Sequence, residues 1–437
     1  MNGLRQEEGR QDKGETVRHE AIDLYLHGLK PTEICRALGR SRSWFYQVLD
    51  RYRQGGRAGL QSQSRAPHVV HNRTKQEVEA AIVRIRQTIA NGQDPELRYA
   101  NLGADSIAAE LKRLKLKPPH RATINRILGR YDLVQPRPRK NKRTKLPADY
   151  PWPKVEQANV LHQVDFVSRR IGGSGDSFYG CHLLDLGRQW PYLRIIATKS
   201  TKNVAQFLVS AWQTVGLPTA LQIDNDIVWN GGGRGQRILS RIVRLSLAVG
   251  VEVIFIPPYT PKANGPIESF NDLWDSNFWG RTEFGDVDHV ETELPLFETY
   301  CRHRRPLPEF EGSSADQIQP DFKPFLLPPD FDLHQQQRIA IRTGFVHFIR
   351  FVSATGTFSI LNETWSLDQK RWADITIRAT IDTQAQQLNI YHHPPKADYC
   401  QLIAQFDYPL TEDVVPLDPA YTRTQPSIWP VVRLFNC

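Results

Sequence analysis

The chain has 437 residues, of which 40% are hydrophobic, and carries a formal net charge of +9. At ~150 residues per domain this length predicts about three domains. The charge favours a polyanionic partner, with nucleic acid ahead of a membrane surface. No apolar run approaches the ~18 residues of a membrane span, and the first 15 residues lack the apolar core of a signal peptide. We therefore expect no membrane partner and a cytoplasmic location, at the bacterial nucleoid.

Residues 14–56 contain three short helical patterns separated by tight turns. Gly28 ends the first, and Ser41 can cap the third. In the third helix an apolar stripe predicts the buried side, and three polar residues fall off that stripe: Arg42, Ser43 and Gln47. This arrangement is typical of a helix-turn-helix that contacts phosphates and base edges. The alternative is an ordinary helical bundle with a solvated polar face.

Residues 57–74 are rich in Gly, Ser and Arg, which indicates a linker. Residues 75–134 contain further helices and a second helix-turn-helix candidate. Its last helix exposes three candidate DNA contacts, which are Arg121, Asn125 and Arg126. Two such modules predict a long, bipartite DNA site; a helical spacer is the alternative for the second one.

Residues 135–154 form a second linker with a cluster of cations. The candidate phosphate contacts in it are Arg137, Arg139, Lys140, Lys142 and Arg143. Prolines favour an extended backbone here. We expect this segment to follow a DNA backbone, because it joins the helical segments to the region that carries the acids described next.

Residues 155–305 alternate between strand and helix patterns. Three strands are followed by helix, strand, helix, strand and helix, which is the pattern of an RNase H-like α/β fold. Asp165 lies within the first strand, Asp224 directly follows the fourth, and Glu268 lies early in the last of these helices. An acid inside an apolar strand is costly unless it is paired or binds a metal.

The three carboxylates are candidates for a catalytic metal site. Carboxylates brought close together repel one another and raise each other's pKa, and divalent cations remove that repulsion. Two ions ~3.5–4 Å apart can activate an attacking hydroxyl and stabilise the leaving oxygen of a phosphodiester. Mg²⁺ suits such oxygen ligands, with Mn²⁺ as an alternative.

The tracts QVDFV, IDNDIVW and YTPKANGPIESFN resemble the motifs of the DDE transposases in the retroviral-integrase superfamily, of the bacterial insertion-sequence type. The resemblance covers roughly residues 159–316 and matches Asp165, Asp224 and Glu268 position by position. It implies metal-dependent cleavage and joining of DNA. In the loop before Glu268, we expect Lys262 and Asn264 to contact phosphate.

The chain departs from the family pattern at three places. Asp226 stands where a glycine is usual, so it could compete with Asp224 for the metal. The 43 residues between Asp224 and Glu268 exceed the usual spacing, and residues 230–236 account for the extra material. Cys301 replaces the usual asparagine in the downstream helix.

The remaining residues predict a Pro-rich linker (306–335), a small β-barrel (336–400) built from five short strand patterns, and an irregular tail (401–437). The expected fold class is therefore multidomain, with N-terminal all-α helix-turn-helix domains, a central α/β RNase H-like catalytic core and a C-terminal small β-barrel.

The sequence as a whole favours a DNA transposase that binds the terminal inverted repeats of a mobile element. It would cleave a strand at the element end and transfer that end into target DNA. Expected partners are double-stranded DNA, from element ends and target, and further copies of the chain in a synaptic homo-oligomer; an ATPase helper stays an open option. The alternatives are a non-catalytic DNA-binding regulator derived from a transposase and an RNase H-fold nuclease.

Overall fold

The structure is a computed structural model. It describes residues 13–62, 73–134, 146–231, 235–331, 339–395, 397, 399–424 and 428–429. The chain divides into two compact units, residues 1–73 and 74–437. The predicted phosphate contacts Arg137, Arg139, Lys140, Lys142 and Arg143 lie outside the described residues.

The first unit is a small helical bundle. Its helices are α1 (Lys13–Leu26), α2 (Pro31–Ala37) and α3 (Arg42–Gly55), followed by a 3₁₀ turn, Gly56–Leu60. The Ser41 hydroxyl accepts a hydrogen bond from the Trp44 amide and so caps α3 as expected. Phe45 and Val48 of α3 pack on Ile22 and Ile34 of the other two helices. These contacts hold the three helices together and leave the polar side of α3 outside.

Three further helices begin the second unit: α4 (Gln76–Asn91), α5 (Ala104–Arg113) and α6 (Arg121–Arg130). Their apolar side chains belong to the same buried cluster as those of α10 and α11 in the core. Polar contacts join the same parts. The Asn277 amide donates to the Tyr99 carbonyl over 2.8 Å, and the Arg281 guanidinium donates to the Ala100 carbonyl over 2.8 Å.

The core follows the element order expected of an RNase H-like fold. Its strands are β1 (Leu161–Arg170), β2 (Ser177–Asp185), β3 (Trp190–Ile196), β4 (Ala220–Ile223) and β5 (Glu252–Phe255). Its helices are α7 (Thr201–Thr214), α8 (Ile227–Asn230), α9 (Arg241–Ala248), α10 (Gly265–Leu273) with a π-helical extension (Trp274–Trp279), and α11 (Val287–His303). The first three strands are antiparallel, whereas β4 and β5 run parallel to β1.

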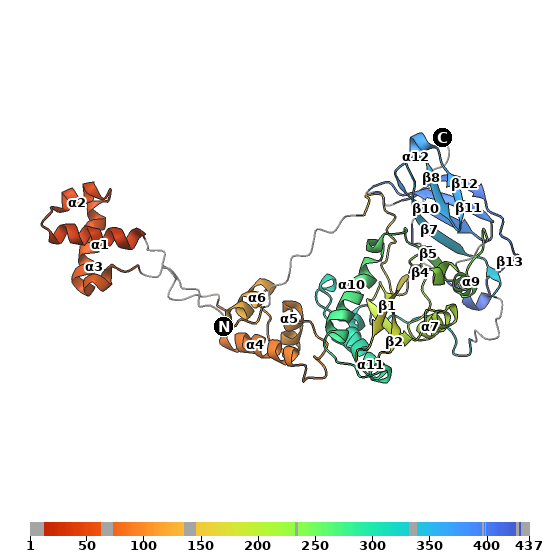
Figure 1. The fold of residues 1–437 in the computed structure, drawn as a ribbon, viewed down its shortest axis with the longest axis horizontal. Coiled ribbons are helices and arrows are strands. Elements are labelled where there is room, and N and C mark those ends of the chain that lie inside the picture. Colours follow the sequence, from red (N-terminus) through yellow and green to blue (C-terminus); the bar gives the residue numbers. More distant parts are fainter. Residues whose placement is uncertain are drawn as a thin grey trace. The chain divides into compact units, whose positions relative to one another are not determined.

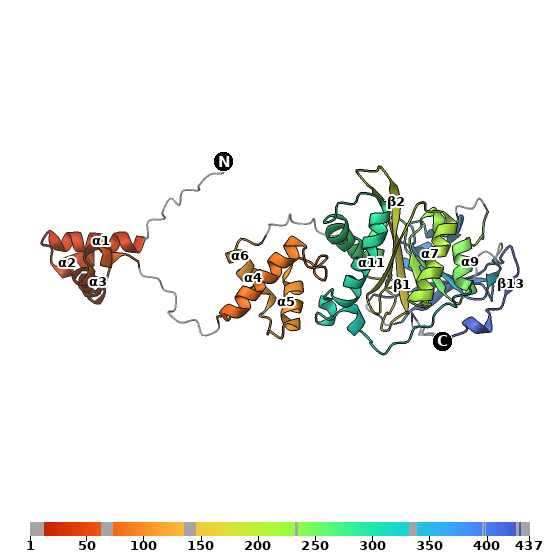
Figure 2. The same ribbon diagram turned by 90° about the horizontal axis from the view of Figure 1, so that it is seen from below.

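Helices cover both faces of this sheet. Figure 2 shows α11 on one side of β1 and β2, with α7 and α9 on the other. The alternation of side chains along β2 fits this arrangement. Cys181 and Leu183 belong to the apolar cluster that contains α7 and α9, whereas Leu184 belongs to the cluster that contains α10 and α11.

The later strands extend the core sheet. They are β6 (Ile341–Arg342), β7 (Phe345–Phe351), β8 (Thr357–Ile360), β9 (Glu363–Ser366), β10 (Thr376–Asp382), β11 (Gln387–His392), β12 (Gln401–Asp407) and β13 (Val414–Val415); the short helix α12 spans Gln369–Trp372. Among the described residues, nine strands form one sheet in the order β12-β11-β10-β7-β5-β4-β1-β2-β3 (Figure 1).

The expected small β-barrel is therefore not confirmed. The strand patterns after residue 340 do form strands, but β7 pairs in parallel with β5 of the core, with Phe348 opposite Phe255. All five inner residues of β7 are buried, including His347 and Arg350. A strand pattern indicates which side chains are apolar but does not tell which edge the strand joins, so the sequence could not separate a barrel from a sheet extension.

The described cysteines, Cys35, Cys181, Cys301 and Cys400, are all buried, and none of them forms a disulfide with another. In the described ranges, no helix has the length and apolar character needed to cross a bilayer.

Candidate active site

The three predicted acids line one cavity of about 430 Å³. Asp165 comes from the middle of β1, Asp224 from the residue after β4, and Glu268 from the first turn of α10. Strands β1 and β4 are parallel neighbours. The end of β4 therefore brings Asp224 to the sheet edge beside Asp165, where an α/β sheet commonly binds its ligands.

Two buried glutamines hold the start of α10 against the sheet. Gln163 lies two residues before Asp165, and its side-chain oxygen accepts a hydrogen bond from the Ile267 amide over 3.1 Å. Gln222 lies two residues before Asp224, and its amide nitrogen donates to the Ala263 carbonyl over 2.9 Å. Residues two apart in a strand share a face. Each strand therefore presents, on one face, a candidate catalytic acid and a glutamine that holds the helix carrying Glu268.

Asp165 is an acid in an unfavourable electrostatic environment. Burial raises its pKa to about 6, and the negative charges of Asp224 and Glu268 add to the rise. Two hydrogen bonds oppose it, from the Phe166 amide over 2.8 Å and from the Asn271 side chain over 2.8 Å. The carboxylates are thus close enough to repel one another, as expected from the sequence.

Asn271 connects this acid to a buried histidine. Its side-chain oxygen lies 2.7 Å from Nδ1 of His182 on β2. Burial lowers the pKa of His182 to about 4, so the ring is neutral at pH 7 and its Nδ1 donates to Asn271. This hydrogen bond fixes the Asn271 amide so that its nitrogen faces Asp165. Asn271 lies three residues, about one helical turn, after Glu268; that spacing was the sequence signal for it, and it was missed.

Asp226, the residue that replaces the usual glycine, has partners of its own. One of its oxygens lies 2.5 Å from the Lys199 ammonium, and the other accepts a hydrogen bond from the Val228 amide over 3.2 Å, which caps α8. Burial alone would raise the pKa of Asp226, but the hydrogen bonds and charge of Lys199 hold it below its usual value. For Asp224, by contrast, burial raises the pKa.

The donor set has the chemistry that a hard divalent cation prefers. Asp165, Asp224 and Glu268 offer carboxylate oxygens on one cavity, and the raised pKa of Asp165 reflects a repulsion that a cation would remove. As the side chains lie, no group of three or more His, Cys, Asp or Glu residues in the described ranges surrounds a single point closely enough to hold an ion. Side-chain rotation at the cavity would be needed to close a metal site.

The structure also locates the other predicted contacts. Arg42, Ser43 and Gln47 are exposed on α3, and Arg121, Asn125 and Arg126 are exposed on α6. Lys262 is half-buried in the turn before α10.

Asn264 is different, because it is buried and its side-chain oxygen accepts a hydrogen bond from Gln222 over 3.1 Å. Asn264 thus helps to hold α10 and also lines the acidic cavity, and its contact with phosphate stays a prediction.

A fully exposed aromatic residue at the cavity was also missed. Tyr259, between Pro258 and Thr260, is 103% exposed and has a positive φ of 55°. It lines the acidic cavity. A backbone in the left-handed region is uncommon for tyrosine, and composition gave no signal for it.

Residues 18–80 match the family model described as "Winged helix-turn helix". The match spans α1 to α3 of the first unit and the start of α4. The first unit is a helix-turn-helix domain. In the described part of this match, residues 18–62 and 73–80, all regular structure is helical, so a β-wing is not seen there.

Solved structures of retroviral integrases are similar to part of this chain at low sequence identity. The catalytic core domain of BIV integrase is 19% identical, with 37% of this chain and 95% of that chain covered and a TM-score of 0.28. The HTLV-2 integrase catalytic core domain in complex with magnesium, trimeric form, is 11% identical, with 38% and 99% covered and a TM-score of 0.29.

A chain of the simian T-cell lymphotropic virus intasome in complex with PP2A regulatory subunit B56 gamma is 13% identical. It covers 68% of this chain and 98% of its own length, with a TM-score of 0.34. Because all three scores are below 0.5, the fold assignment rests on the strand order and helix placement described above.

Proposed function

We propose that the chain is a DNA transposase that cleaves DNA at the ends of a mobile element and joins those ends to target DNA. The observation that carries this proposal is the shared cavity of Asp165, Asp224 and Glu268, three acids that come from three separate elements. The helix-turn-helix domain supports DNA as the substrate.

The proposed metal ligands are Asp165, Asp224 and Glu268. Mg²⁺ ions bound there would polarise the phosphodiester and stabilise the charge on the attacking and leaving oxygens. The chain itself contributes the geometry: Gln163 and Gln222 hold the start of α10, and Asn271 orients Asp165. Water would be the nucleophile in cleavage and the freed 3′-hydroxyl in joining, so a covalent protein–DNA intermediate is not required.

DNA recognition is proposed for the exposed polar residues of α3 and α6, with Lys262 near the cavity. Joining two element ends in one reaction requires at least two copies of the chain, so a synaptic homo-oligomer is part of the proposal. Whether an ATPase helper takes part is left to experiment.

The test is strand transfer by the purified chain with Mg²⁺ and duplexes that carry candidate element ends. Wild type is compared with Asp224→Asn and with Asp226→Asn. Asp226 is engaged by Lys199 and by the α8 cap, which supports Asp224 as the ligand. We expect joined products to be lost in Asp224→Asn and retained in Asp226→Asn.

Other outcomes support the alternative functions. Cut ends without joined products would indicate a nuclease of the same fold. DNA binding without cutting or joining, with Mg²⁺ or Mn²⁺, would indicate a regulator. Loss of joining in Asp226→Asn alone would move the metal ligand from Asp224 to Asp226.

A further inference from the structure

Arg350 is a buried cation on β7, the strand that joins the sheet extension to the core. It is 8% exposed, and burial lowers its pKa to about 10. Its guanidinium donates to three backbone carbonyls and one side-chain amide, and it forms no ion pair with any described residue. Burying a charge without a countercharge is costly. A neutral apolar residue would fill the same space at a lower free-energy cost. This comparison indicates that the hydrogen bonds donated by Arg350 have a function.

Two of these acceptors border the acidic cavity. Arg350 Nη2 donates to the Asn225 side-chain oxygen over 3.0 Å, and Nη1 donates to the Ile256 carbonyl over 3.2 Å. Asn225 directly follows Asp224, and Ile256 begins the loop that leads to α10. The Asn225 amide nitrogen also donates to the Ile256 carbonyl, over 2.6 Å. Arg350, Asn225 and Ile256 therefore form a closed set of three hydrogen bonds.

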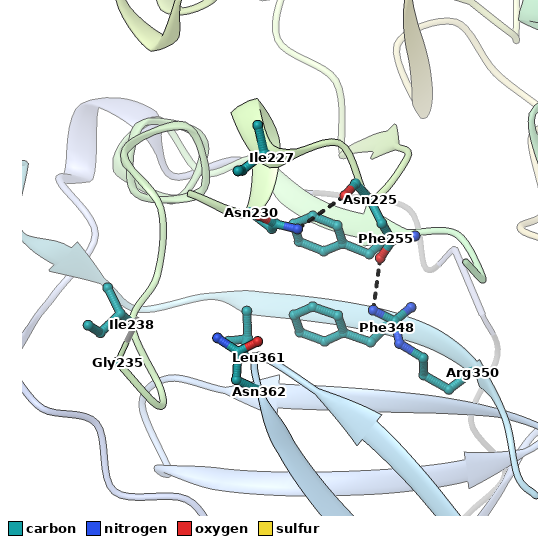
Figure 3. Close-up of a pocket in the computed structure, with 10 residues that line it drawn as sticks. All are labelled: Asn225, Ile227, Asn230, Gly235, Ile238, Phe255, Phe348, Arg350, Leu361 and Asn362. Atoms are coloured by element: carbon teal, nitrogen blue, oxygen red, sulfur yellow. Dashed lines mark hydrogen bonds between the residues drawn. The ribbon is translucent and has the colours of Figure 1, made fainter. Parts of the chain in front are cut away.

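Asn225 lies between two cavities. It lines the acidic cavity and also a neighbouring cavity of about 420 Å³, whose lining includes Arg350, Phe255 and Phe348. Figure 3 shows the second cavity, with Asn225 held by Arg350 from below and with its own carbonyl bound by Asn230. The side-chain oxygen and nitrogen of Asn225 and its backbone carbonyl are thus all hydrogen-bonded, and these bonds together fix its orientation.

We propose that Arg350 is a positioning residue for the acidic site, which holds Asn225 and Ile256 and thereby sets the segment that carries Asp224. This inference rests on the proposed function, because it assigns Arg350 a part in the same reaction. The parallel pairing of β5 and β7 explains how Arg350, which is 125 positions after Asn225, reaches the site. Phe348 lies opposite Phe255. The side chain of Arg350, two residues further along β7, projects from the same face of the sheet.

Arg378 provides a matched control. It lies on the neighbouring strand β10, opposite Ile349, and is 4% exposed. Its hydrogen-bond partners are His393, His347, Thr380 and Cys400, its guanidinium also lies over the rings of Tyr391 and Trp429, and it lines neither cavity. Burial lowers its pKa as well. The two arginines are thus both buried and lie on neighbouring strands, but they project from opposite faces of the sheet and only Arg350 is connected to the segment that carries Asp224.

The experiment compares Arg350→Lys with Arg378→Lys in the full chain. Lysine keeps the charge but has one ammonium, which cannot reproduce the fixed directions of a guanidinium. We expect both variants to lose similar thermal stability. Arg350→Lys should also lower the initial rate of strand joining by about 10–100-fold, the usual effect of losing support behind a metal ligand, with DNA affinity unchanged. Arg378→Lys should join DNA at the wild-type rate.

A double-mutant comparison separates positioning from general destabilisation. Arg350 acts partly through Asn225 and partly through its own bond to the Ile256 carbonyl, so the variant that combines Asn225→Ala with Arg350→Lys should lose joining rate by less than the product of the two single losses. Multiplied rate losses in the double variant, or equal rates for Arg350→Lys and Arg378→Lys, would overturn the proposal.

The binding of Mn²⁺ to the full chain, measured by calorimetry without DNA, gives a second readout. Arg350→Lys should weaken it about 10-fold, whereas Arg378→Lys should leave it at the wild-type value. If the wild type neither joins DNA nor binds Mn²⁺, the proposed function itself fails. If the wild type is active and Arg350→Lys behaves as the wild type does, only the role of Arg350 fails.

Discussion

Neighbouring residues at the cavity differ in the direction in which the fold shifts their pKa. Burial raises the pKa of Asp165 to about 6, and the charges of Asp224 and Glu268 add to the rise although two amides donate hydrogen bonds to it. Asp226 is paired with Lys199, so its pKa is lowered. A bound cation would stabilise the charge of Asp165, whereas the charge of Asp226 is already stabilised by Lys199. This difference separates a candidate metal ligand from a structural acid at the same cavity.

The raised pKa of Asp165 predicts a pH dependence of stability without metal. The folded state binds the Asp165 proton more tightly than the unfolded state, so the favourable contribution is complete at low pH and is lost as pH rises through about 6. Asp165→Asn should therefore gain stability relative to wild type between pH 4.5 and 7.5. The difference is at most about 3 kcal/mol, since one pKa unit corresponds to about 1.4 kcal/mol.

The measurement is thermal unfolding in EDTA at several pH values, read as the difference between variant and wild type. Asp226→Asn provides a contrast of opposite sign. Because its folded pKa is lowered, Asp226 stabilises the fold above its unfolded pKa, and that benefit disappears as pH falls. A constant difference for Asp165→Asn across this range would contradict the assignment of the raised pKa to Asp165.

At the scale of elements, the position of α10 depends on two side chains from the sheet. Gln222 is 2% exposed and supplies a donor to the Ala263 carbonyl and the Asn264 side chain. Gln163 supplies an acceptor to the Ile267 amide. The helix that carries Glu268 is thus tied to the strands that carry Asp165 and Asp224.

Replacing Gln222 by alanine is expected to reduce both stability and activity. The Ala263 carbonyl and Asn264 side chain would lose a buried donor, which costs about 1–3 kcal/mol for each unsatisfied group. Equilibrium unfolding in urea measures this loss. The joining rate, measured well below the unfolding midpoint, should fall as well, because Glu268 is no longer held in place.

Gln213→Ala is the matched control for this prediction. The Gln213 side chain on α7 donates to the Pro328 and Pro329 carbonyls near solvent, away from the acidic cavity. Water can replace those bonds, so the stability loss should be smaller and the joining rate unchanged. Equal joining rates for Gln222→Ala and the wild type would contradict the prediction that Gln222 holds α10, and with it Glu268, in place.

At the scale of the whole molecule, local patterns predicted more than long-range pairing. The positions of Asp165, Asp224 and Glu268 could be inferred because each lies beside a strong strand or helix pattern. The helices of the first unit could be inferred from caps and periodicity, and the family match to residues 18–80 confirms a helix-turn-helix there.

Arg350 could not be found in this way. Its role depends on β7 pairing with β5, and nothing local in the β7 sequence indicates that partner. A separate β-barrel was expected for the same reason. Its strands could be recognised from the sequence, but their pairing with the core sheet could not. The burial of Asn264 and its hydrogen bond from Gln222 could not be predicted either, because they depend on where β4 lies relative to the loop before α10.

The sheet extension makes a whole-molecule prediction about truncation. Apolar residues after position 340 share one buried cluster with the core, among them Val346, Phe348, Ile377, Ile381 and Leu388. These five side chains contribute about 1.5–3 kcal/mol each when buried, which together rivals the ~5–15 kcal/mol net stability of a typical domain. A chain of residues 1–331 also leaves the β5 edge unpaired. We therefore expect it to lack a cooperative unfolding transition and to aggregate.

The converse truncation should be tolerated. Residues 74–437 form a compact unit of their own, so removal of residues 1–73 should leave a cooperative transition and lose only the DNA contacts of α3. Calorimetry and sedimentation of the two truncated chains test both statements.

A folded, monomeric chain of residues 1–331 would mean that the core does not need β7, and would restore the organisation with an independent C-terminal domain. It would also remove the basis for a role of Arg350, since that residue would then be dispensable for a folded acidic site.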